Sequence, residues 1–319
     1  MSHNIKHSIG KIGGKAKMST SFFGVFCGIM AAVCYGTNPL GALKLYAQGM
    51  QTGPVLFYRF GLAWLIIAGV MLVRSMVLKG RRRETLRVTA KEFGTLTALG
   101  LLFIVSSLTL YLSFHLMDAG VASTILFTYP VMTAIIMALF FHERITWLTL
   151  ASIVLSFVGV ALLYRGDGTV TLPVKGVVLV LLSALSYAVY IIVAARGNLR
   201  MSSFKINFYV LLYCAIGMLL YALLSGERIM LPPNAESWFY VGWLAIVPAI
   251  MALVLLVYAA KYAGSTTTAI LGALEPLTAV LIGIFVFGER FTLSLALGIV
   301  LILASVVLIV RGVPAGNKS

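Results

Sequence analysis

The sequence predicts an all-α membrane protein with ten transmembrane helices. Of its 319 residues, 61% are hydrophobic and 10% are charged, and the mean hydropathy is +1.04, whereas a soluble globular domain carries about 25% charged residues. A helix rising about 1.5 Å per residue needs roughly 20 apolar residues to cross a bilayer. Ten segments meet this requirement: 22–43, 53–73, 93–116, 119–141, 145–164, 174–195, 204–224, 237–260, 265–288 and 291–310.

The distribution of basic residues predicts the topology. With a cytoplasmic N-terminus and alternating spans, 18 of the 24 Lys and Arg residues fall on the cytoplasmic side, and Arg59 lies within a span. The positive-inside rule therefore places both termini, the tails 1–21 and 313–319, in the cytoplasm. The run KGRRRETLR at 79–87 is interpreted as an anchor on anionic lipid headgroups rather than as a nucleic-acid site.

Internal similarity divides the chain into two halves. Residues 129–166 align without a gap on 275–312, with Pro130 on Pro276, and 24–36 resembles 176–188. We therefore expect two five-helix repeats at 22–166 and 174–312. Because five is odd, the two repeats are predicted to be inserted in opposite orientations. Inverted repeats are typical of carriers that work by alternating access, with the site at the repeat interface near the midplane, although they also occur in channels.

The whole pattern resembles a known family. Ten spans, the 5+5 duplication, and fourth and ninth spans that contain a proline and end in (H/G)ER(I/F)T are similar to the EamA-like branch of the drug/metabolite transporter superfamily. The resemblance covers about residues 20–312. It implies a bacterial inner-membrane carrier with a central cavity lined mainly by spans 1, 3, 4, 6, 8 and 9. It also implies small polar substrates, many of them amino acids and commonly exported, and it extends to carriers of sugar phosphates and nucleotide-sugars.

Glu275 is the first candidate site residue. It lies about ten residues into the ninth span and is followed by Pro276. A charged side chain at the bilayer centre costs about 2.5–3.5 kcal/mol on insertion scales and is a functional-site hypothesis by default. Glu275 is predicted to face the cavity and to bind a substrate amine or a coupling proton. The structural alternative is a protonated carboxyl group hydrogen-bonded between helices.

Three further positions carry polar groups toward the outer side. Arg59 lies six residues into the second span and is expected to pair with a substrate carboxylate, to pair with Glu275, or to snorkel to the headgroups. Asn38 and Pro39 interrupt the first span, as a binding site or hinge or as a simple kink. His115, at the outer end of the third span, is a second proton-coupling candidate, or a solvated histidine.

Tyrosines inside the spans are candidates for the cavity wall, because a buried hydroxyl group needs a hydrogen-bond partner. The candidates are Tyr35, Tyr111, Tyr129, Tyr187 and Tyr190. The predicted hinges are Pro130, Pro276 and Pro39. Glu143 and Glu289 are interpreted as structural carboxylates that complement the N-terminal dipole of the helix that follows each of them.

Several chemistries lack a signal in the sequence. There is no GxxxxGK[ST] loop, HExxH or GxSxG, so we expect no enzyme, no catalytic residue, no cofactor and no metal. The sequence predicts a secondary transporter, a monomer or homodimer in the bilayer, that exports or exchanges amino acids or related metabolites. The alternatives are a carrier of phosphorylated solutes or nucleotide-sugars, and a lipid flippase or scramblase.

Overall fold

The computed structural model describes residues 22–77, 86–142, 146–165, 172–197, 199 and 201–312. All regular structure in these residues is helical. The first half contains a helix at 22–36, α2 (Asn38–Ala47), α3 (Thr52–Val77), α4 (Ala90–Ser113), α5 (Ala119–Leu126), α6 (Tyr129–Phe141) and α7 (Trp147–Arg165). The second half contains α8 (Val174–Arg196), α9 (Ser203–Leu224), α10 (Ala235–Ile246), a π-helix (Val247–Met251), α11 (Ala252–Ala263), α12 (Ser265–Leu271), α13 (Leu274–Phe287) and α14 (Leu293–Gly312).

These helices have the lengths and composition of membrane spans. Within the described residues, nine helical segments are long and apolar enough to cross a bilayer, and the apolar segment 293–308 of α14 is shorter than these nine. Large apolar side chains such as Leu72, Phe140, Phe157 and Phe285 are exposed on the outside of the bundle, where lipid would cover them. The helical membrane fold is confirmed, whereas the count of ten and the orientation of the termini stay predictions.

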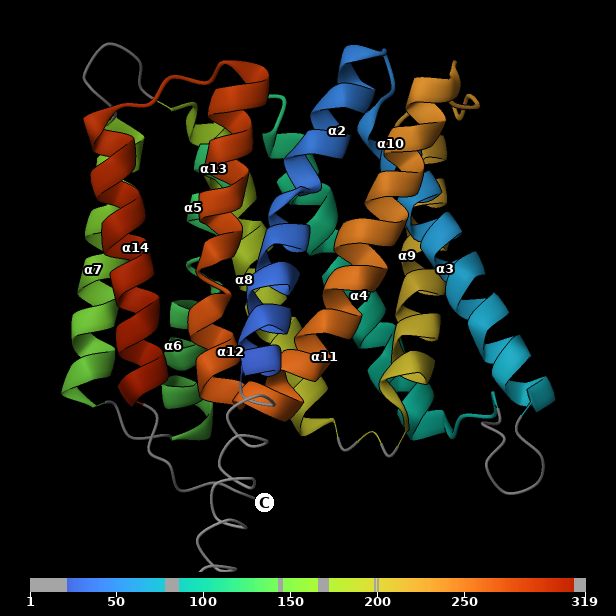
Figure 1. Ribbon diagram of the computed structural model, residues 1–319, viewed down its shortest axis with the longest axis horizontal. Coiled ribbons are helices and arrows are strands. Elements are labelled where there is room, and N and C mark those ends of the chain that lie inside the picture. The colour runs from blue at the N-terminus through green and yellow to red at the C-terminus, as the bar shows by residue number, and fades with distance from the viewer. Residues whose placement is uncertain are drawn as a thin grey trace, which may run out of the picture.

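The helix at 22–36 begins, and α14 ends, at the same face of the bundle (Figure 1). We call this the terminal face and the other one the opposite face. The tails 1–21 and 313–319, the basic residues at 79–83 and Glu143 lie outside the described residues, so the predictions made for them are unchanged.

Four spans are interrupted in their interior. The first breaks at Thr37, before Asn38 and Pro39. The α5–α6 and α12–α13 pairs each break two residues before a helix with proline at its start, and Pro248 lies in the π-helix between α10 and α11. Proline cannot donate a backbone hydrogen bond, and broken helices are tolerated at membrane depth where they line a cavity or are buried in protein.

Local sequence also sets where helices begin and end. Thr89 and Glu92 form a capping box at the start of α4, with Thr89 N donating to Glu92 Oε2 at 2.8 Å. The C-terminal caps of α6 and α13 are His142 and Gly288, both left-handed, with φ of 56° and 68°. These two positions correspond in the repeat alignment, so the two halves end equivalent helices with the same backbone conformation.

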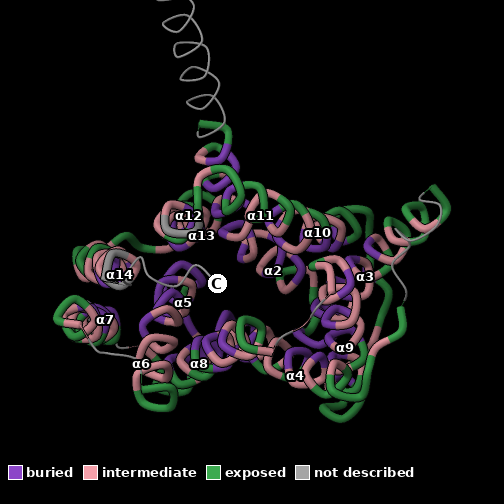
Figure 2. The backbone as a smooth tube through the Cα atoms, turned by 90° about the horizontal axis from the view of Figure 1, so that it is seen from below, coloured by how far each residue is buried: buried purple, intermediate pink, exposed green. Residues whose placement is uncertain are grey.

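Packing between the halves follows the repeat (Figure 2). Helix α3 packs on α9, α7 on α14, and α5 on α13, while α4 packs on α8 and α10 on α2. In each of the first two pairs, a helix contacts its own counterpart from the other half, and in the third α5 contacts the counterpart of α6, so that the two spans broken by Pro130 and Pro276 pack on each other. The last two pairs are equivalent to each other. This arrangement leaves the helices with broken or polar segments around the centre.

Candidate functional site

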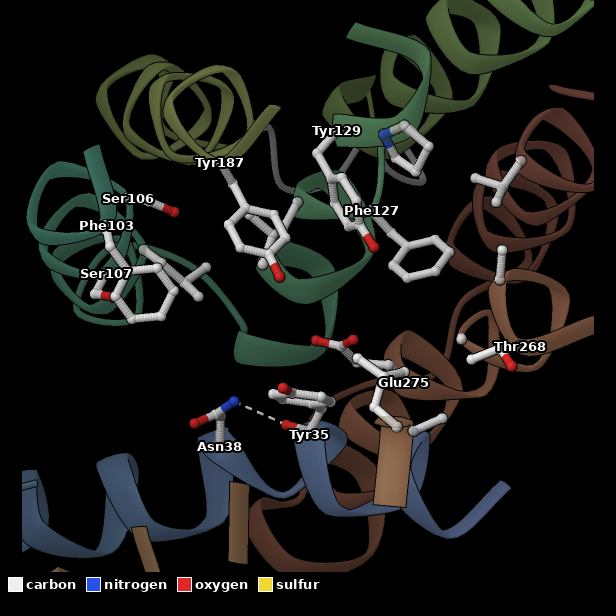
Figure 3. Close-up of a pocket in the computed structure, with 18 of the residues that line it drawn as sticks. Tyr35, Asn38, Phe103, Ser106, Ser107, Phe127, Tyr129, Tyr187, Thr268 and Glu275 are labelled. Carbon is white, nitrogen blue, oxygen red and sulfur yellow. Dashed lines mark hydrogen bonds between the residues drawn. The ribbon is translucent and has the colours of Figure 1, made fainter. Parts of the chain in front are cut away.

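A cavity of about 470 Å³ lies at the centre of the bundle (Figure 3). Helices of both halves line it, including the helix at 22–36, α4, α6, α8, α11 and α12. The six spans expected from the family resemblance all contribute, and Arg59 of α3 and Val306 and Val310 of α14 line it as well. Its volume falls within the range of about 300–1,000 Å³ typical of small-molecule sites.

Glu275 lies in the first turn of α13 and is half-buried. Its carboxylate points into the cavity (Figure 3), and within the described residues it has neither a hydrogen-bond donor nor an ion-pair partner. A close helix contact holds this position, because a Cβ on Gly36 would lie 2.5 Å from Thr278 Cβ and 2.6 Å from the Glu275 carbonyl oxygen. The glycine therefore lets the helix that carries Tyr35 approach the start of α13.

Aromatic rings face Glu275 across the cavity. Tyr129 and Tyr187 meet edge to face, with centroids 4.8 Å apart at 82°, and Phe127 meets Tyr129 in the same way at 5.6 Å. The hydroxyl groups of Tyr35, Tyr129 and Tyr187 point into the cavity (Figure 3) and have no hydrogen-bond partner in the described part of the chain. Three hydroxyl groups and one carboxylate thus point into the same cavity, and none of them forms a hydrogen bond with the described residues.

Tyr190 has a different place. Its ring stacks on that of Tyr187 with centroids 5.8 Å apart and an interplanar angle of 6°, and it lies 5.3 Å from the ring of Phe103. It is absent from the cavity lining. The structure therefore places Tyr190 behind the wall, where it packs on Tyr187, and not among the residues that line the cavity.

Arg59, Tyr111 and Asn38 form a polar layer toward the opposite face. Arg59 is 6% exposed, and its Nη1 donates to the Tyr111 hydroxyl group at 2.5 Å. That hydroxyl group donates to Asn38 Oδ1 at 3.3 Å, and Asn38 Nδ2 donates to the Tyr35 carbonyl oxygen at 2.8 Å. The last bond satisfies a carbonyl group freed by the break in the first span, which explains an asparagine beside Pro39.

A second layer closes the cavity above this one. The Tyr46 hydroxyl group donates to the Tyr111 carbonyl oxygen at 3.2 Å, and Thr52 Oγ1 lies 3.0 Å from His115 Nε2. The Tyr46 and His115 rings stack with centroids 4.1 Å apart. Partial burial lowers the pKa of His115, and the Glu227 carboxylate opposes this shift. His115 thus lies in the contacts at the opposite face and not in the cavity lining.

The hydrogen bonds of Glu289 differ from those expected. Its carboxylate accepts from the backbone of Ala119 at 2.8 Å and of Gly120 at 3.2 Å, at the start of α5. The helix that follows it is capped instead by Thr292, whose Oγ1 accepts from Leu295 N at 3.1 Å. The interpretation of Glu289 as a partner of the next helix is therefore wrong, because it caps a helix in the other half.

The environment of Glu289 shifts its titration. Burial raises the pKa of Glu289, the nearby Asp118 carboxylate raises it further, and the bonds from Ala119 and Gly120 lower it. Burial also raises the pKa of Asp118. Glu289 and Asp118 come from different halves, so this contact joins the halves at the opposite face.

Toward the terminal face the lining contributed by α11 and α14 is apolar. It includes Leu256 and Ala260 of α11, and Val306 and Val310 of α14. Both helices end at the terminal face (Figure 1), and Val310 lies two residues before the end of its helix. The cavity therefore extends from the polar centre toward the terminal face, while hydrogen-bonded layers lie between it and the opposite face.

Most of the candidate residues meet in this cavity. Its lining contains seven predicted substrate-binding residues and one predicted hinge: Tyr35, Asn38, Arg59, Tyr111, Tyr129, Tyr187, Glu275 and Pro130. Pro39 and Pro276 are buried at the starts of their helices instead. Sequence reasoning missed Phe103, Phe127, Ser106, Ser107 and Thr268. Of these, Phe127 had a usable signal, since it lies three residues before the predicted hinge Pro130. No group of three or more metal-binding side chains occurs in the described residues.

Comparison with known proteins agrees with this architecture. The EamA-like transporter family matches residues 22–165 and 174–311. A protein of Archaeoglobus fulgidus named an uncharacterized transporter is 30% identical over 60% of this chain and 67% of its own length. The uncharacterized inner membrane transporters YedA of Escherichia coli K12 and YicL of Salmonella typhimurium are 24% and 26% identical, over 77% and 88% of this chain and 79% and 93% of their own.

A crystal structure of another protein is similar with a TM-score of 0.63, over 89% of this chain and 95% of that one. At 18% identity this likeness concerns the fold alone. The two family matches together span most of the chain. They agree with a helical bundle that is built of two halves around a central cavity. The chain belongs to the EamA-like transporter family and is a multi-pass membrane transporter.

Proposed function

We propose that the protein is a secondary active transporter that binds the amino group of a small polar metabolite at Glu275. It exports or exchanges amino acids or related compounds. The observation that carries this proposal is the Glu275 carboxylate, which faces the cavity and has neither a hydrogen-bond donor nor an ion-pair partner among the residues that the structure describes. A carboxylate at membrane depth needs a positive partner or a proton, and here the solute or the coupling ion supplies it.

The surroundings of Glu275 suit an ammonium group. An ammonium group offers three donors, and the cavity offers the carboxylate and the hydroxyl groups of Tyr35, Tyr129 and Tyr187 as acceptors. Aromatic faces also attract cations within about 6 Å of the ring centroid. The apolar part of the solute would lie against Phe103 and Phe127, which line the same cavity.

Alternating access is the mechanism that this arrangement favours. The α5–α6 and α12–α13 breaks lie beside Tyr129 and Glu275, so each half carries a hinge at the site. If the five-helix halves are inverted, rocking one against the other would close one face and open its equivalent. If both termini are cytoplasmic, the cavity extends toward the cytoplasmic face, and outward opening requires the Arg59–Tyr111 and Glu289–α5 contacts to break.

Two other functions make different demands on the cavity. A carrier of phosphorylated solutes needs clustered cations, and Arg59 is the one Lys or Arg in the described lining. A flippase needs an apolar lateral path for acyl chains, and the apolar lining contributed by α11 and α14 is the feature that would favour it. The unpartnered polar groups around Glu275 favour a small solute over both.

The test is transport by purified protein in proteoliposomes, with counterflow of radiolabelled amino acids measured at several pH values. Glu275→Gln should abolish transport or remove its dependence on pH. Glu236→Gln is the matched control, because Glu236 is an exposed residue in the first turn of α10. Unchanged transport by Glu275→Gln at every pH would refute the assigned role, and translocation of lipid without solute would favour a flippase.

A further inference from the structure

Arg59 is a buried cation without an anionic partner. It is 6% exposed, lines the cavity and is the eighth of the 26 residues of α3. No carboxylate of the described residues forms an ion pair with it. Glu275 lines the same cavity, yet no ion pair joins it to Arg59. An arginine that only snorkelled would place its guanidinium group in the headgroup region, whereas this one is enclosed by protein.

The free hydrogen-bonding capacity of Arg59 lies along one edge of its guanidinium group. Nη1 donates to Tyr111, Nε is sealed from solvent without an acceptor, and Nη2 has no acceptor in the described residues. The Nε and Nη2 hydrogens point in parallel, and this fork matches the two oxygens of a carboxylate. Nε is covered in this conformation, so a small shift of the side chain must accompany two-point binding.

The surroundings hold the guanidinium group in place but leave its charge unbalanced. Its central carbon lies 5.2 Å from the centroid of the Phe60 ring and 5.4 Å from that of Tyr111, distances at which aromatic faces attract cations. Tyr111 is itself fixed by its bond to Asn38. All these partners are neutral. An unpaired buried charge destabilises a protein. An anion from outside the chain that binds the Arg59 guanidinium group would therefore stabilise it.

We propose that Arg59 binds the carboxylate group of the transported solute. This inference rests on the proposed function and deepens it: Glu275 and Arg59 are the two poles of one site, and the substrate class is a small zwitterion with both an amino and a carboxylate group. Tyr35 belongs to both poles, since its hydroxyl group faces the cavity beside Glu275 while its carbonyl group is bound by Asn38. A single guanidinium group with neutral neighbours fits a carboxylate better than a phosphate, which needs more positive charge.

The test compares ligands that differ in one group. The melting temperature of the purified protein is measured with each of the common amino acids, with the amine obtained by decarboxylating it, and with its methyl ester. Phosphorylated sugars form a separate arm. Because a ligand that binds the folded state raises its stability, amino acids should raise the melting temperature more than their amines or esters. Arg59→Met should weaken amino-acid binding about 10- to 100-fold and leave amine binding unchanged.

A second readout needs no ligand. If Arg59 serves the substrate, Arg59→Met removes an unpaired buried charge and should raise the melting temperature of the ligand-free protein. If Arg59 is structural, the same change should lower it. Arg74→Met is the control, since Arg74 lies on the same helix, is exposed and faces the ring of Phe204.

The failures of the two proposals can be told apart. Equal binding of amino acids and amines by wild type and by Arg59→Met would overturn the carboxylate site and leave the role of Glu275 intact. Loss of amine binding in Glu275→Gln supports the amine site independently, and its retention refutes that site alone. A panel in which no carboxylate compound raises the melting temperature, or in which only phosphorylated sugars do so through Arg59, overturns the inference.

Discussion

Gly283 leaves room for the contact that joins α5 to α13, and replacing it with alanine tests that contact. A Cβ at Gly283 would lie 2.0 Å from Glu289 Oε2 and 2.5 Å from Glu289 Cδ, far inside contact distance. The side chain of Glu289 would therefore have to leave the start of α5. Its two acceptor bonds, from Ala119 at 2.8 Å and from Gly120 at 3.2 Å, would be lost.

The size of the effect follows from what the displaced carboxylate leaves behind. Ala119 and Gly120 are buried, and each buried N–H without an acceptor costs about 1–3 kcal/mol. Two effects offset part of this loss of stability. Alanine stabilises a helix relative to glycine by about 1 kcal/mol, and the displaced carboxylate of Glu289 becomes hydrated again. We therefore expect Gly283→Ala to destabilise the protein by about 2 kcal/mol, which corresponds to a fall of about 4 °C in melting temperature.

The assay is thermal unfolding in detergent, followed by circular dichroism at one heating rate because unfolding of such proteins is often irreversible. Gly61→Ala in α3 is the matched control, since a Cβ there meets nothing within 4 Å. It should leave the melting temperature unchanged or raise it slightly. A double-mutant cycle isolates the contact: in a Glu289→Ala background, Gly283→Ala should no longer destabilise.

Two outcomes of this cycle would contradict the contact between Glu289 and the start of α5. If Gly283→Ala stabilises the protein as much as Gly61→Ala does, the carboxylate of Glu289 does not occupy the space beside Gly283. If Gly283→Ala destabilises equally with and without Glu289, the cost comes from helix packing and not from the cap on α5.

Three other changes test separate parts of the structure. Gly36→Ala places a methyl group 2.5 Å from Thr278 Cβ, so it should force the helix at 22–36 away from α13. We expect this change to destabilise the protein by about 1–3 kcal/mol and to impair transport. Wild-type transport activity would contradict the close contact. Because burial and Asp118 raise the pKa of Glu289, the stability contributed by Glu289 is fully present below its ordinary pKa of about 4.3 and is lost as pH rises through the raised pKa. Asp118→Asn should therefore reduce the fall in melting temperature between about pH 4 and pH 7, and an unchanged pH profile would show that the two carboxyl groups do not interact. Tyr129→Phe keeps the ring contact but removes a free hydroxyl group, so amine binding should weaken about 5-fold at unchanged melting temperature; unaltered affinity would remove that hydroxyl group from the site.

Much of the site was predictable because polar residues in a membrane span are rare and therefore informative. Glu275 and Arg59 stand out in apolar surroundings, and the sequence places a proline at each of the four interrupted spans. A charge at membrane depth is costly and a proline cannot continue the hydrogen-bond pattern of a helix, so each signal is local. The repeat alignment added that the halves carry Tyr129 and Glu275 at matched positions.

The apolar part of the site was much harder to predict. Lipid and protein interior are both apolar, so the hydrophobic pattern of a membrane helix does not mark its inward side as it does in a soluble protein. Phe103 of α4 lines the cavity, and nothing in its sequence context separates it from the phenylalanines that face lipid. Tyr187 and Tyr190 lie one turn apart on α8, and only the structure shows that Tyr187 faces the cavity and Tyr190 supports it.

The sequence by itself determined the helical membrane fold, its duplication, the interruptions at prolines, and the presence of one acid and one arginine within the spans. The tertiary structure decided which helices meet, that Glu275 and Arg59 face one cavity without pairing, and that Glu289 caps α5 about 170 residues away in the chain. The physical reason is that hydropathy and backbone chemistry act locally. The partner of a buried charge, in contrast, is set by packing between distant helices.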